Sequence, residues 1–169
     1  MGKEEVIGVY AGTFDPITNG HLDLIVRALT VVDTLYVAVA KSTPKKVAFT
    51  DAKRVAIAKE AISQFAPEVH KRIVVESFSG LLVEYVSSLN ARLIIRGLRA
   101  VSDYEYEAQM AHINRHLDDS VETVFLATSK DCSFISSSIV KNIAASGGSV
   151  AGLVPANVIE VLAKHFESK

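Results

Sequence analysis

The sequence lacks several features that secreted, membrane-spanning and nucleic-acid-binding proteins need. Its single cysteine excludes a disulfide within the chain and is typical of a reducing compartment. The net charge of −1 gives no basic excess that would attract DNA or RNA. No N-terminal stretch joins basic residues to the apolar core of a secretion signal, and the most apolar stretch, residues 31–40, is interrupted by Asp33 and too short to cross a bilayer. We therefore expect a cytoplasmic protein without nucleic-acid or membrane partners.

What the sequence does contain is the composition of an ordinary globular domain. The 169 residues are 49% hydrophobic and 22% charged, which suffices for a core and argues against disorder. Segments rich in Val, Ile and Leu alternate with segments of helical periodicity. We expect strands over residues 6–10, 34–40, 72–76, 91–95 and 122–127, and helices over residues 51–65, 81–89, 102–117, 135–145 and 156–166, with a further helix beginning near Leu22.

This alternation predicts an α/β fold. Apolar strands with helices between them form a parallel sheet that is covered on both faces. The predicted fold is a Rossmann-like, doubly wound, five-stranded parallel sheet with C-terminal helices, in a single domain over residues 1–169. In such sheets ligands bind beyond the carboxyl ends of the strands, where the strand order reverses. The segments that should surround a ligand are therefore residues 11–20, 41–50, 77–80, 96–102 and 128–137.

The first of these segments carries the strongest functional signal. Residues 12–21 (GTFDPITNGH) join a buried strand to an amphipathic helix and put His21 in the first turn of that helix. Free backbone N–H groups and the positive end of the helix dipole make a helix start a suitable site for phosphate. Gly12 and Gly20 allow the backbone to approach a ligand closely. We expect a nucleoside triphosphate here, with His21 as a donor to it.

Two later segments carry cations. After the second strand, Lys41, Lys45 and Lys46 form either a solvated basic loop or a lid over phosphates. Arg96 and Arg99 follow the buried run 93–95, and a guanidinium at the end of an interior strand is costly to bury without an anion. Each arginine would either fork onto phosphate oxygens or form an ion pair. The acidic candidates for those ion pairs are Asp103, Glu105 and Glu107.

The serine run 136–138 begins a helix, with Lys141 one turn further on. The serines are either helix caps or, with the helix N–H groups, a site for the outer phosphates of ATP. In the helix over 102–117, Ser102 and Glu105 match a capping box, and Glu107 by itself indicates a solvated position. We expect one apolar stripe of that helix to face the core, leaving Tyr104, Ala108 and Ala111 to meet a neighbouring subunit. The residues of the stripe are Tyr106, Met110, Ile113 and Leu117.

His112 and His116 lie four residues apart on the same predicted helix. This spacing suits zinc, but the sequence offers no evident third ligand, so surface or interface histidines are favoured. No P-loop lysine motif, nucleophile elbow or cysteine pair is present in the sequence.

A series of ordered motifs resembles a known family over nearly the whole chain. Residues 18–21 (TNGH) resemble the TxGH form of the HxGH signature of nucleotidylyltransferases, which are related in fold to class I aminoacyl-tRNA synthetases, and residues 135–141 (ISSSIVK) resemble their second signature, ISSSxxR/K. Residues 95–100 (IRGLRA) and 103–107 (DYEYE), with 114–117 (NRHL), narrow the resemblance to the bacterial phosphopantetheine adenylyltransferase family. Members transfer the adenylyl group of ATP to 4′-phosphopantetheine, giving dephospho-coenzyme A and pyrophosphate.

The resemblance implies a role for individual residues. His21 would stabilise the transition state, while Lys45 and Arg96 would bind the acceptor phosphate and Leu82 the pantetheine arm. Thr13 would contact both ATP and the acceptor phosphate. Cys132 stands where members of the family carry an aromatic residue. The positions implied for ATP are Thr13, Phe14, His21, Gly97, Leu98, Arg99, Glu107, Cys132, Ser133, Phe134, Ile135, Ser136, Ser137 and Ser138.

The resemblance also implies a homohexamer, magnesium carried with ATP, no metal held by the protein itself, and inhibition by coenzyme A. Since the acceptor is already an anionic phosphate, no general base is needed, and positioning with electrostatic stabilisation is the expected means of catalysis. Two rivals remain open at the level of sequence. One is a nucleotidylyltransferase for another phosphate, such as nicotinamide mononucleotide or glycerol phosphate, and the other is a nucleotide-sensing module without turnover.

Overall fold

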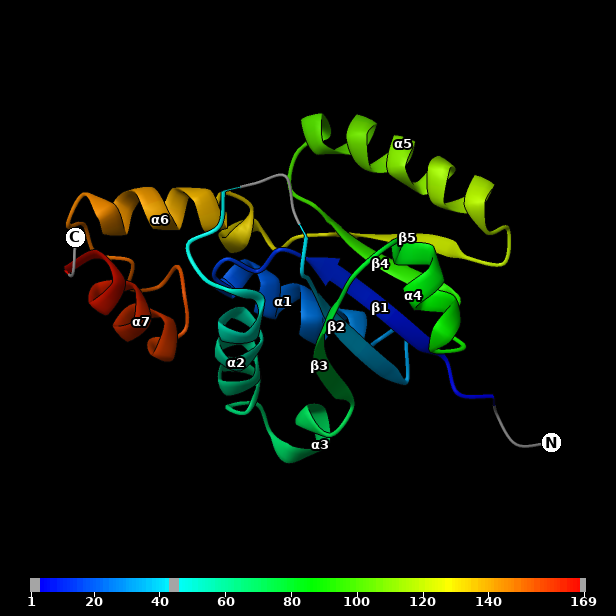
Figure 1. Cartoon of the computed structure of the whole chain (residues 1–169), viewed down its shortest axis with the longest axis horizontal. Coiled ribbons are helices and arrows are strands. Elements are labelled where there is room, and N and C mark those ends of the chain that lie inside the picture. The colour runs from blue at the N-terminus through cyan, green and yellow to red at the C-terminus, as the bar shows by residue number, and fades with distance from the viewer. Residues whose placement is uncertain (1–3, 43–45, 168–169) are drawn as a thin grey trace.

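The computed structural model describes residues 4–42 and 46–167. Its five strands, β1 (Ile7–Gly12), β2 (Thr34–Ala40), β3 (Ile73–Phe78), β4 (Leu93–Leu98) and β5 (Glu122–Ala127), form one sheet. The strands are ordered β3-β2-β1-β4-β5, and every pairing is parallel. The chain runs outward from β1 in one direction and then returns to its other side with β4, so the predicted doubly wound sheet is confirmed (Figure 1).

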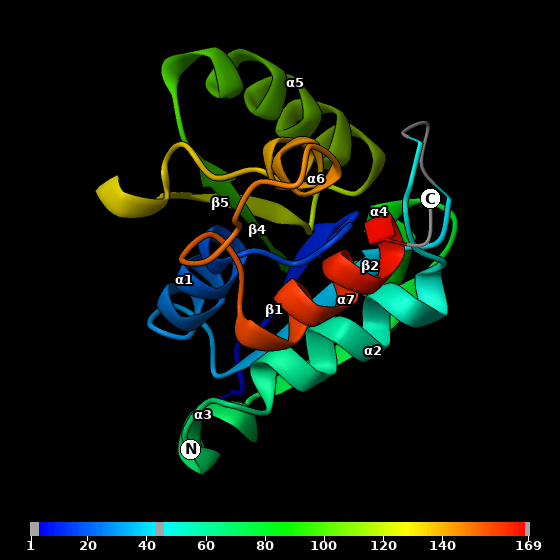
Figure 2. The ribbon, with the colours of Figure 1, turned by 90° about the vertical axis from the view of Figure 1, so that its left-hand side faces the viewer.

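Helices cover both faces of this sheet. They are α1 (Asn19–Ala28), α2 (Asp51–Ile62), α3 (Pro67–His70), α4 (Leu82–Ser88), α5 (Val101–Leu117), α6 (Ser137–Ala145) and α7 (Ala156–Glu167), with a short 3₁₀ helix, η1 (Lys130–Cys132). The C-terminal helices α6 and α7 lie on the side of α1 and α2, whereas α4 covers the opposite face (Figure 2). In the described residues no helix has both the length and the apolar character needed to cross a membrane.

The strands supply two cores because successive side chains point to opposite faces. On β1, Tyr10 belongs to the larger core, which α1, α2, α6 and α7 complete. Its neighbours Val9 and Ala11 belong to the smaller core, together with Val86 of α4. Both faces of the central strand are therefore buried, as the continuous apolar runs of the sequence predict.

Several element boundaries differ from the sequence-based expectation. β4 starts at Leu93 and continues through Arg96 and Gly97 to Leu98, because it pairs with β5 as far as Leu98–Ala127. The expected loop over 96–102 therefore begins inside a strand. The capping box of α5 is wrong as well: the helix begins at Val101, its N-cap is Ala100, and no side chain caps it.

The orientation of α5 also differs from the expectation. Tyr106 is 62% exposed and Leu117 is 51% exposed, and Ile113 is exposed too, so the predicted core-facing stripe is wrong for these three residues. The reason is the position of α5 over β4, β5 and α4, at the edge of the sheet, where little apolar surface is available to cover it (Figure 1).

Candidate active site

The site is a crevice where two neighbouring strands separate. Within the described residues, β1 pairs with β4 only at Gly8–Leu93 and Val9–Ile94. On their other sides, β1 pairs with β2 up to Gly12 and β4 pairs with β5 up to Leu98. The carboxyl ends of β1 and β4 therefore diverge at the point where the strand order reverses, which is where open α/β sheets bind ligands.

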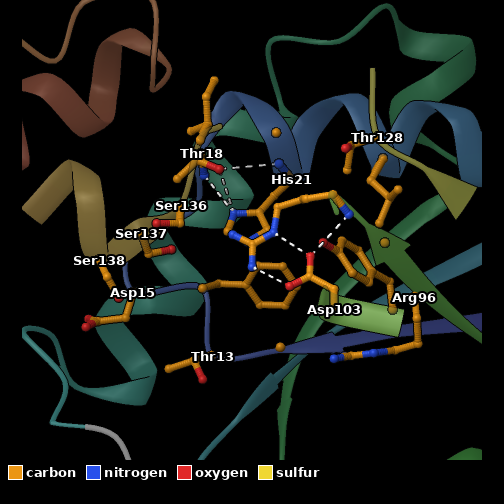
Figure 3. Close-up of a pocket in the computed structure, with 18 of the residues that line it drawn as sticks. Thr13, Asp15, Thr18, His21, Arg96, Asp103, Thr128, Ser136, Ser137 and Ser138 are labelled. Atoms are coloured by element: carbon orange, nitrogen blue, oxygen red, sulfur yellow. Dashed lines mark hydrogen bonds and ion pairs between the residues drawn. The ribbon is translucent and has the colours of Figure 1, made fainter. Parts of the chain in front are cut away.

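A cavity of about 890 Å³ occupies this crevice. That volume lies in the range of small-molecule and cofactor sites. Its walls come from segments far apart in the sequence, and Figure 3 shows Thr13, His21 and Ser137 around the same hollow. The lining includes these residues that the sequence singled out: Thr13, Phe14, His21, Lys46, Arg96, Gly97, Arg99, Glu107, Cys132, Ile135, Ser136, Ser137, Ser138 and Lys141.

Thr18 fixes the protonation pattern of the His21 ring. Thr18 is the N-cap of α1, and its backbone N–H donates to His21 Nδ1 over 2.9 Å. Nδ1 is therefore an acceptor, so the proton of the neutral ring sits on Nε2. The hydroxyl oxygen of Thr18 lies 3.0 Å from the same nitrogen and accepts from the backbone nitrogen of His21 over 3.4 Å, which completes a capping box (Figure 3). His21 thus offers an Nε2–H donor at the cavity.

The surroundings of His21 keep its ring neutral. Burial against the protein lowers its pKa from 6.5 to about 4, and the positive charges of Arg99 and Arg96 act in the same direction. A triphosphate close to the ring would favour the imidazolium form and so work against this shift.

Phe14 holds the His21 ring from the side. Its backbone has φ 47°, a conformation that a bulky residue rarely adopts. The ring of Phe14 is buried and makes edge contacts with Tyr10 and His21, at centroid distances of 5.3 and 5.0 Å. A strained backbone kept in place by such packing is a common feature of sites that must be rigid.

The two arginines of the crevice are both ion-paired. Arg96 donates to both carboxylate oxygens of Glu107, through Nε at 2.7 Å and Nη2 at 2.6 Å, and Nη1 donates to the carbonyl of Ala11 at 2.8 Å. Burial opposes the charge of Arg96, but the hydrogen bonds and charge of Glu107 more than offset it, so the pKa of Arg96 is raised. Within the described residues, three of the five guanidinium N–H groups of Arg96 have an acceptor, which leaves two for a ligand.

Arg99 is held more loosely than Arg96. Its Nε donates to Asp103 over 3.2 Å, one turn into α5, and its side chain is 43% exposed against 29% for Arg96. Partial burial would raise the pKa of Asp103, but hydrogen bonds and charge from Arg99 lower it overall. Of the ion pairs considered from the sequence, those with Asp103 and Glu107 are formed.

The start of α6 offers backbone donors to the cavity. Ser136 is the N-cap and accepts from the N–H of Ile139, while the Ser137 hydroxyl donates to the carbonyl of Pro16 at 2.8 Å. Two of the three serines therefore have structural tasks. The N–H groups of Ser137 and Ser138 belong to the first turn, where a helix supplies no acceptor, and both residues line the cavity.

The start of α1 is less open than the sequence indicates. The Asn19 N–H donates to the carbonyl of Leu153, and the His21 N–H is directed at Thr18 Oγ1. The expectation of free N–H groups here is wrong for these two positions, because the C-terminal loop and the N-cap already satisfy them. Backbone N–H groups without a helical acceptor are more available on α6.

Some expected site residues are not among the described residues that line the cavity. Lys45 falls outside the described residues, although Lys46 and Val47 line the cavity. Leu82 packs against the smaller core instead of lining the cavity. Three others are also absent from its lining, and their roles stay predictions: Leu98, Ser133 and Phe134.

Histidine and acidic residues do not gather into a metal site in the described part of the chain. No group of three or more His, Cys, Asp and Glu side chains there is arranged to hold an ion. His112 and His116 instead line a separate hollow on α5 with Ala108 and Ile113. The carboxylates that line the cavity are each engaged by a cation: Asp15 by Lys141, Asp103 by Arg99 and Glu107 by Arg96.

Sequence reasoning missed the burial of two charges at the cavity, one of them in its lining. Asp15 and Arg54 are 2% and 1% exposed. Asp15 was visible as part of the first motif, but nothing indicated its partners. Arg54 precedes Ile57 and Ala58 by three and four residues, so helical spacing places it on the same buried face of α2. Its charge, by contrast, favours an exposed position. Tyr10, Tyr106 and Thr128 also line the cavity and were not anticipated there.

Comparisons with known proteins agree with this architecture. The cytidylyltransferase-like family matches residues 9–143. A phosphopantetheine adenylyltransferase of Thermodesulfovibrio yellowstonii is 53% identical over 95% of this chain and 97% of its own length, and one of Alkaliphilus oremlandii is 47% identical over 95% and 99%. The solved Plasmodium falciparum nicotinic acid mononucleotide adenylyltransferase has a TM-score of 0.72 over 96% of both chains at 15% identity, which is a likeness of fold.

The residues that match the cytidylyltransferase-like family run from β1 into α6, so they include the sheet, the crevice and the serine run. The curated relatives extend the likeness over nearly the whole chain. The chain therefore belongs to the phosphopantetheine adenylyltransferase family of cytidylyltransferase-like nucleotidyltransferases.

Proposed function

We propose that this chain transfers the adenylyl group of ATP to 4′-phosphopantetheine, releasing dephospho-coenzyme A and pyrophosphate. The observation that carries the proposal is the neutral His21 ring, fixed as an Nε2–H donor in a crevice that also contains two arginines and the start of α6. An oxygen of the acceptor phosphate would attack the α-phosphorus of ATP, and the bond from that phosphorus to the pyrophosphate oxygen would break. The nucleophile is already anionic, so the site needs no general base.

The proposed division of the cavity follows the two arginines. Arg96, with Lys45 and Thr13, would bind the acceptor phosphate, and Leu82 would contact the pantetheine arm. Arg99, with the α6 N–H groups, would bind the triphosphate. The proposed ATP contacts are Thr13, Phe14, His21, Gly97, Leu98, Arg99, Glu107, Cys132, Ser133, Phe134, Ile135, Ser136, Ser137 and Ser138.

His21 would act on the charge that develops at the α-phosphate. A fixed neutral donor stabilises that charge without any reorganisation at the moment of reaction. The two arginines and Lys46 would reduce the repulsion between acceptor phosphate and triphosphate, which is the main obstacle to bringing two anions together. Residues 1–169 would act as one nucleotidylyltransferase domain.

Magnesium would enter with the substrate. The lining carboxylates Asp15, Asp103 and Glu107 are each paired with a cation, so the residues present do not fit a metal held by the protein. The ion would be coordinated by the triphosphate oxygens of ATP, and no residue of the protein is proposed as its ligand.

Further proposals concern assembly, location and regulation. Helix α5 leaves Tyr104, Ile113 and Leu117 exposed, and an apolar surface of this kind on a helix is suited to a second copy of the chain. We propose a closed homohexamer in the cytoplasm that is inhibited by coenzyme A and belongs to coenzyme A biosynthesis. Light scattering tests the assembly: a hexamer mass is expected, Ile113→Asp should lower it, and a monomer mass for the unaltered chain would contradict the proposal.

The reaction itself is tested by product identification. The protein is mixed with ATP and 4′-phosphopantetheine, and in parallel with nicotinamide mononucleotide or glycerol phosphate, and the products are identified by mass spectrometry. Dephospho-coenzyme A alone is expected. An adenylylated product from another acceptor would favour the rival nucleotidylyltransferase, and ATP binding without any product would favour a sensing module.

A further inference from the structure

Two charged side chains at the cavity are buried: Asp15 belongs to the cavity lining, and Arg54 lies outside it. Asp15 and Arg54 are the charged residues that are buried in the described part of the chain. Taking a charge out of water is expensive, and a buried ion pair contributes little net stability. Their partners show what these two charges hold.

Asp15 joins three segments of the chain through one carboxylate. Its Oδ1 accepts from the N–H of Phe49 at 3.0 Å, and its Oδ2 accepts from the N–H of Ala48 at 2.8 Å. The same Oδ2 receives the ammonium of Lys141 from α6 at 2.5 Å. The first motif, the end of the lysine-bearing segment and the serine helix therefore meet at Asp15.

Arg54 holds the same segment from the other side. Its Nε donates to the carbonyl of Phe49 at 3.1 Å, and Nη1 donates to the carbonyls of Ala40 at 3.0 Å and Thr13 at 2.5 Å. Phe49 is thus fixed through both its N–H and its carbonyl. Lys46 and Val47, which directly precede Ala48, line the cavity.

We infer that Asp15, Arg54 and Lys141 are positioning residues, which fix the segment Ala48–Phe49 and thereby hold Lys46 at the acceptor side of the cavity. Lys141 in particular acts through Asp15 and not as a direct phosphate ligand, although it lines the cavity and is the basic residue of the motif over residues 135–141. Its side chain is 21% exposed, and its ammonium is already engaged by a carboxylate that is 3% exposed. This inference rests on the proposed function only for the identity of the acceptor.

Lys141→Met tests the inference because it removes the ammonium and keeps much of the aliphatic chain. We expect the Kd of 4′-phosphopantetheine, measured by calorimetry without ATP, to rise about tenfold, while the Kd of ATP changes by less than about threefold. Lys141→Arg should restore most of the affinity. Lys59→Met is the matched control, since Lys59 is an exposed lysine of α2 that does not line the cavity.

A double variant shows whether the effect passes through Lys46. If it does, Lys141→Met should weaken acceptor binding far less in a Lys46→Ala background than in the unaltered protein. The effects of two mutations are not additive when one residue acts through the other. Full additivity would overturn the inference. So would a larger loss of ATP affinity than of acceptor affinity, which would make Lys141 a direct ligand of the triphosphate.

A ligand-free measurement separates this inference from the proposed function. Hydrogen exchange of the Ala48 and Phe49 amides should accelerate in Lys141→Met and in Asp15→Asn, but not in Lys59→Met. If the unaltered protein fails to bind 4′-phosphopantetheine, the proposed function is contradicted, and the exchange result still decides the positioning role. Unchanged exchange would overturn the inference, because Asp15 and Lys141 would then have no positioning effect. Loss of folding in both Lys141→Met and Asp15→Asn would overturn it too, because the role of the two residues would then be purely structural.

Discussion

Helices α1 and α5 both start at the crevice, and they are built in opposite ways. α1 is capped by Thr18 and buries Leu24, Ile25 and Ala28 in the larger core. α5 has no side-chain cap, and its Val101 and Tyr106 are 88% and 62% exposed. The contrast explains where fixed geometry comes from. His21 is rigid because one face of its helix is packed against the core. Helix α5 instead contributes Asp103 and Glu107, which form ion pairs with the arginines, and its exposed face is partly apolar.

The strongest way to test the role of α1 is to remove its histidine. His21→Ala should fold normally and lower kcat by roughly two to three orders of magnitude, which is the usual loss when one preorganised donor is removed. Steady-state kinetics of dephospho-coenzyme A formation measure it. His70→Ala on α3, whose side chain is exposed and away from the cavity, is the control. A rate within a few-fold of the unaltered protein would refute the assignment.

Truncating one leucine on each helix tests the difference in packing. Leu24 is 1% exposed and Leu117 is 51% exposed. Leu24→Ala should lower the free energy of unfolding by about 2–5 kcal/mol, because it leaves a cavity in the core. Leu117→Ala should cost less than about 1 kcal/mol in a dissociated chain. Urea unfolding at low protein concentration provides both values, and equal losses would remove the contrast between the two helices.

The two arginines that form ion pairs with α5 sharpen the comparison further. Arg96→Ala should weaken 4′-phosphopantetheine binding more than ATP binding, and Arg99→Ala should do the reverse, each by about tenfold or more for its own ligand. Arg96 lies on β4 toward β1, whereas Arg99 lies beyond the strand and pairs within the first turn of α5. Calorimetry with each ligand measures the two effects. Similar losses for both ligands in both variants would show that the roles are not divided.

The smallest expected effect is a titration of His21 in the intact protein. Its pKa of about 4 lies below the usual 6.5, so the ring is neutral in the folded protein at pH 5 and above. Because the pKa of His21 is lower in the folded than in the unfolded state, the contribution of this residue to the free energy of unfolding is complete above pH 6.5. That contribution is lost as the pH falls from 6.5 toward 4. Nitrogen-15 NMR should show Nε2 protonated and Nδ1 unprotonated at pH 7. A midpoint near 6.5 or above in the unliganded protein would contradict this account.

The sheet could be predicted from the sequence, and the ends of its strands could not. Apolar runs such as residues 34–40 identify a buried strand directly, and β2 has those bounds. β4 continues past its apolar run through Arg96 because β5 pairs with it there, and pairing partners are not visible in a single segment. The same limit applies to α5, where periodicity indicated an apolar face but not what would cover it.

The candidate site was predictable where a motif combined unusual residue types, as in residues 12–21 and 135–141. Arg54 could not be anticipated, because its burial depends on three carbonyls from Thr13, Ala40 and Phe49, which only the fold brings together. For the same reason the engagement of Lys141 with Asp15, 126 residues away along the chain, was not visible in the signature that contains it.

The most direct test of the central claim is the stoichiometry of the reaction. Phosphorus-31 NMR of the protein with magnesium, ATP and 4′-phosphopantetheine follows substrates and products together. The account predicts that one pyrophosphate appears for each dephospho-coenzyme A, that neither forms without the acceptor, and that the reverse reaction regenerates ATP from the two products. Pyrophosphate or AMP released without 4′-phosphopantetheine, or no turnover with it, would contradict adenylyl transfer at this crevice.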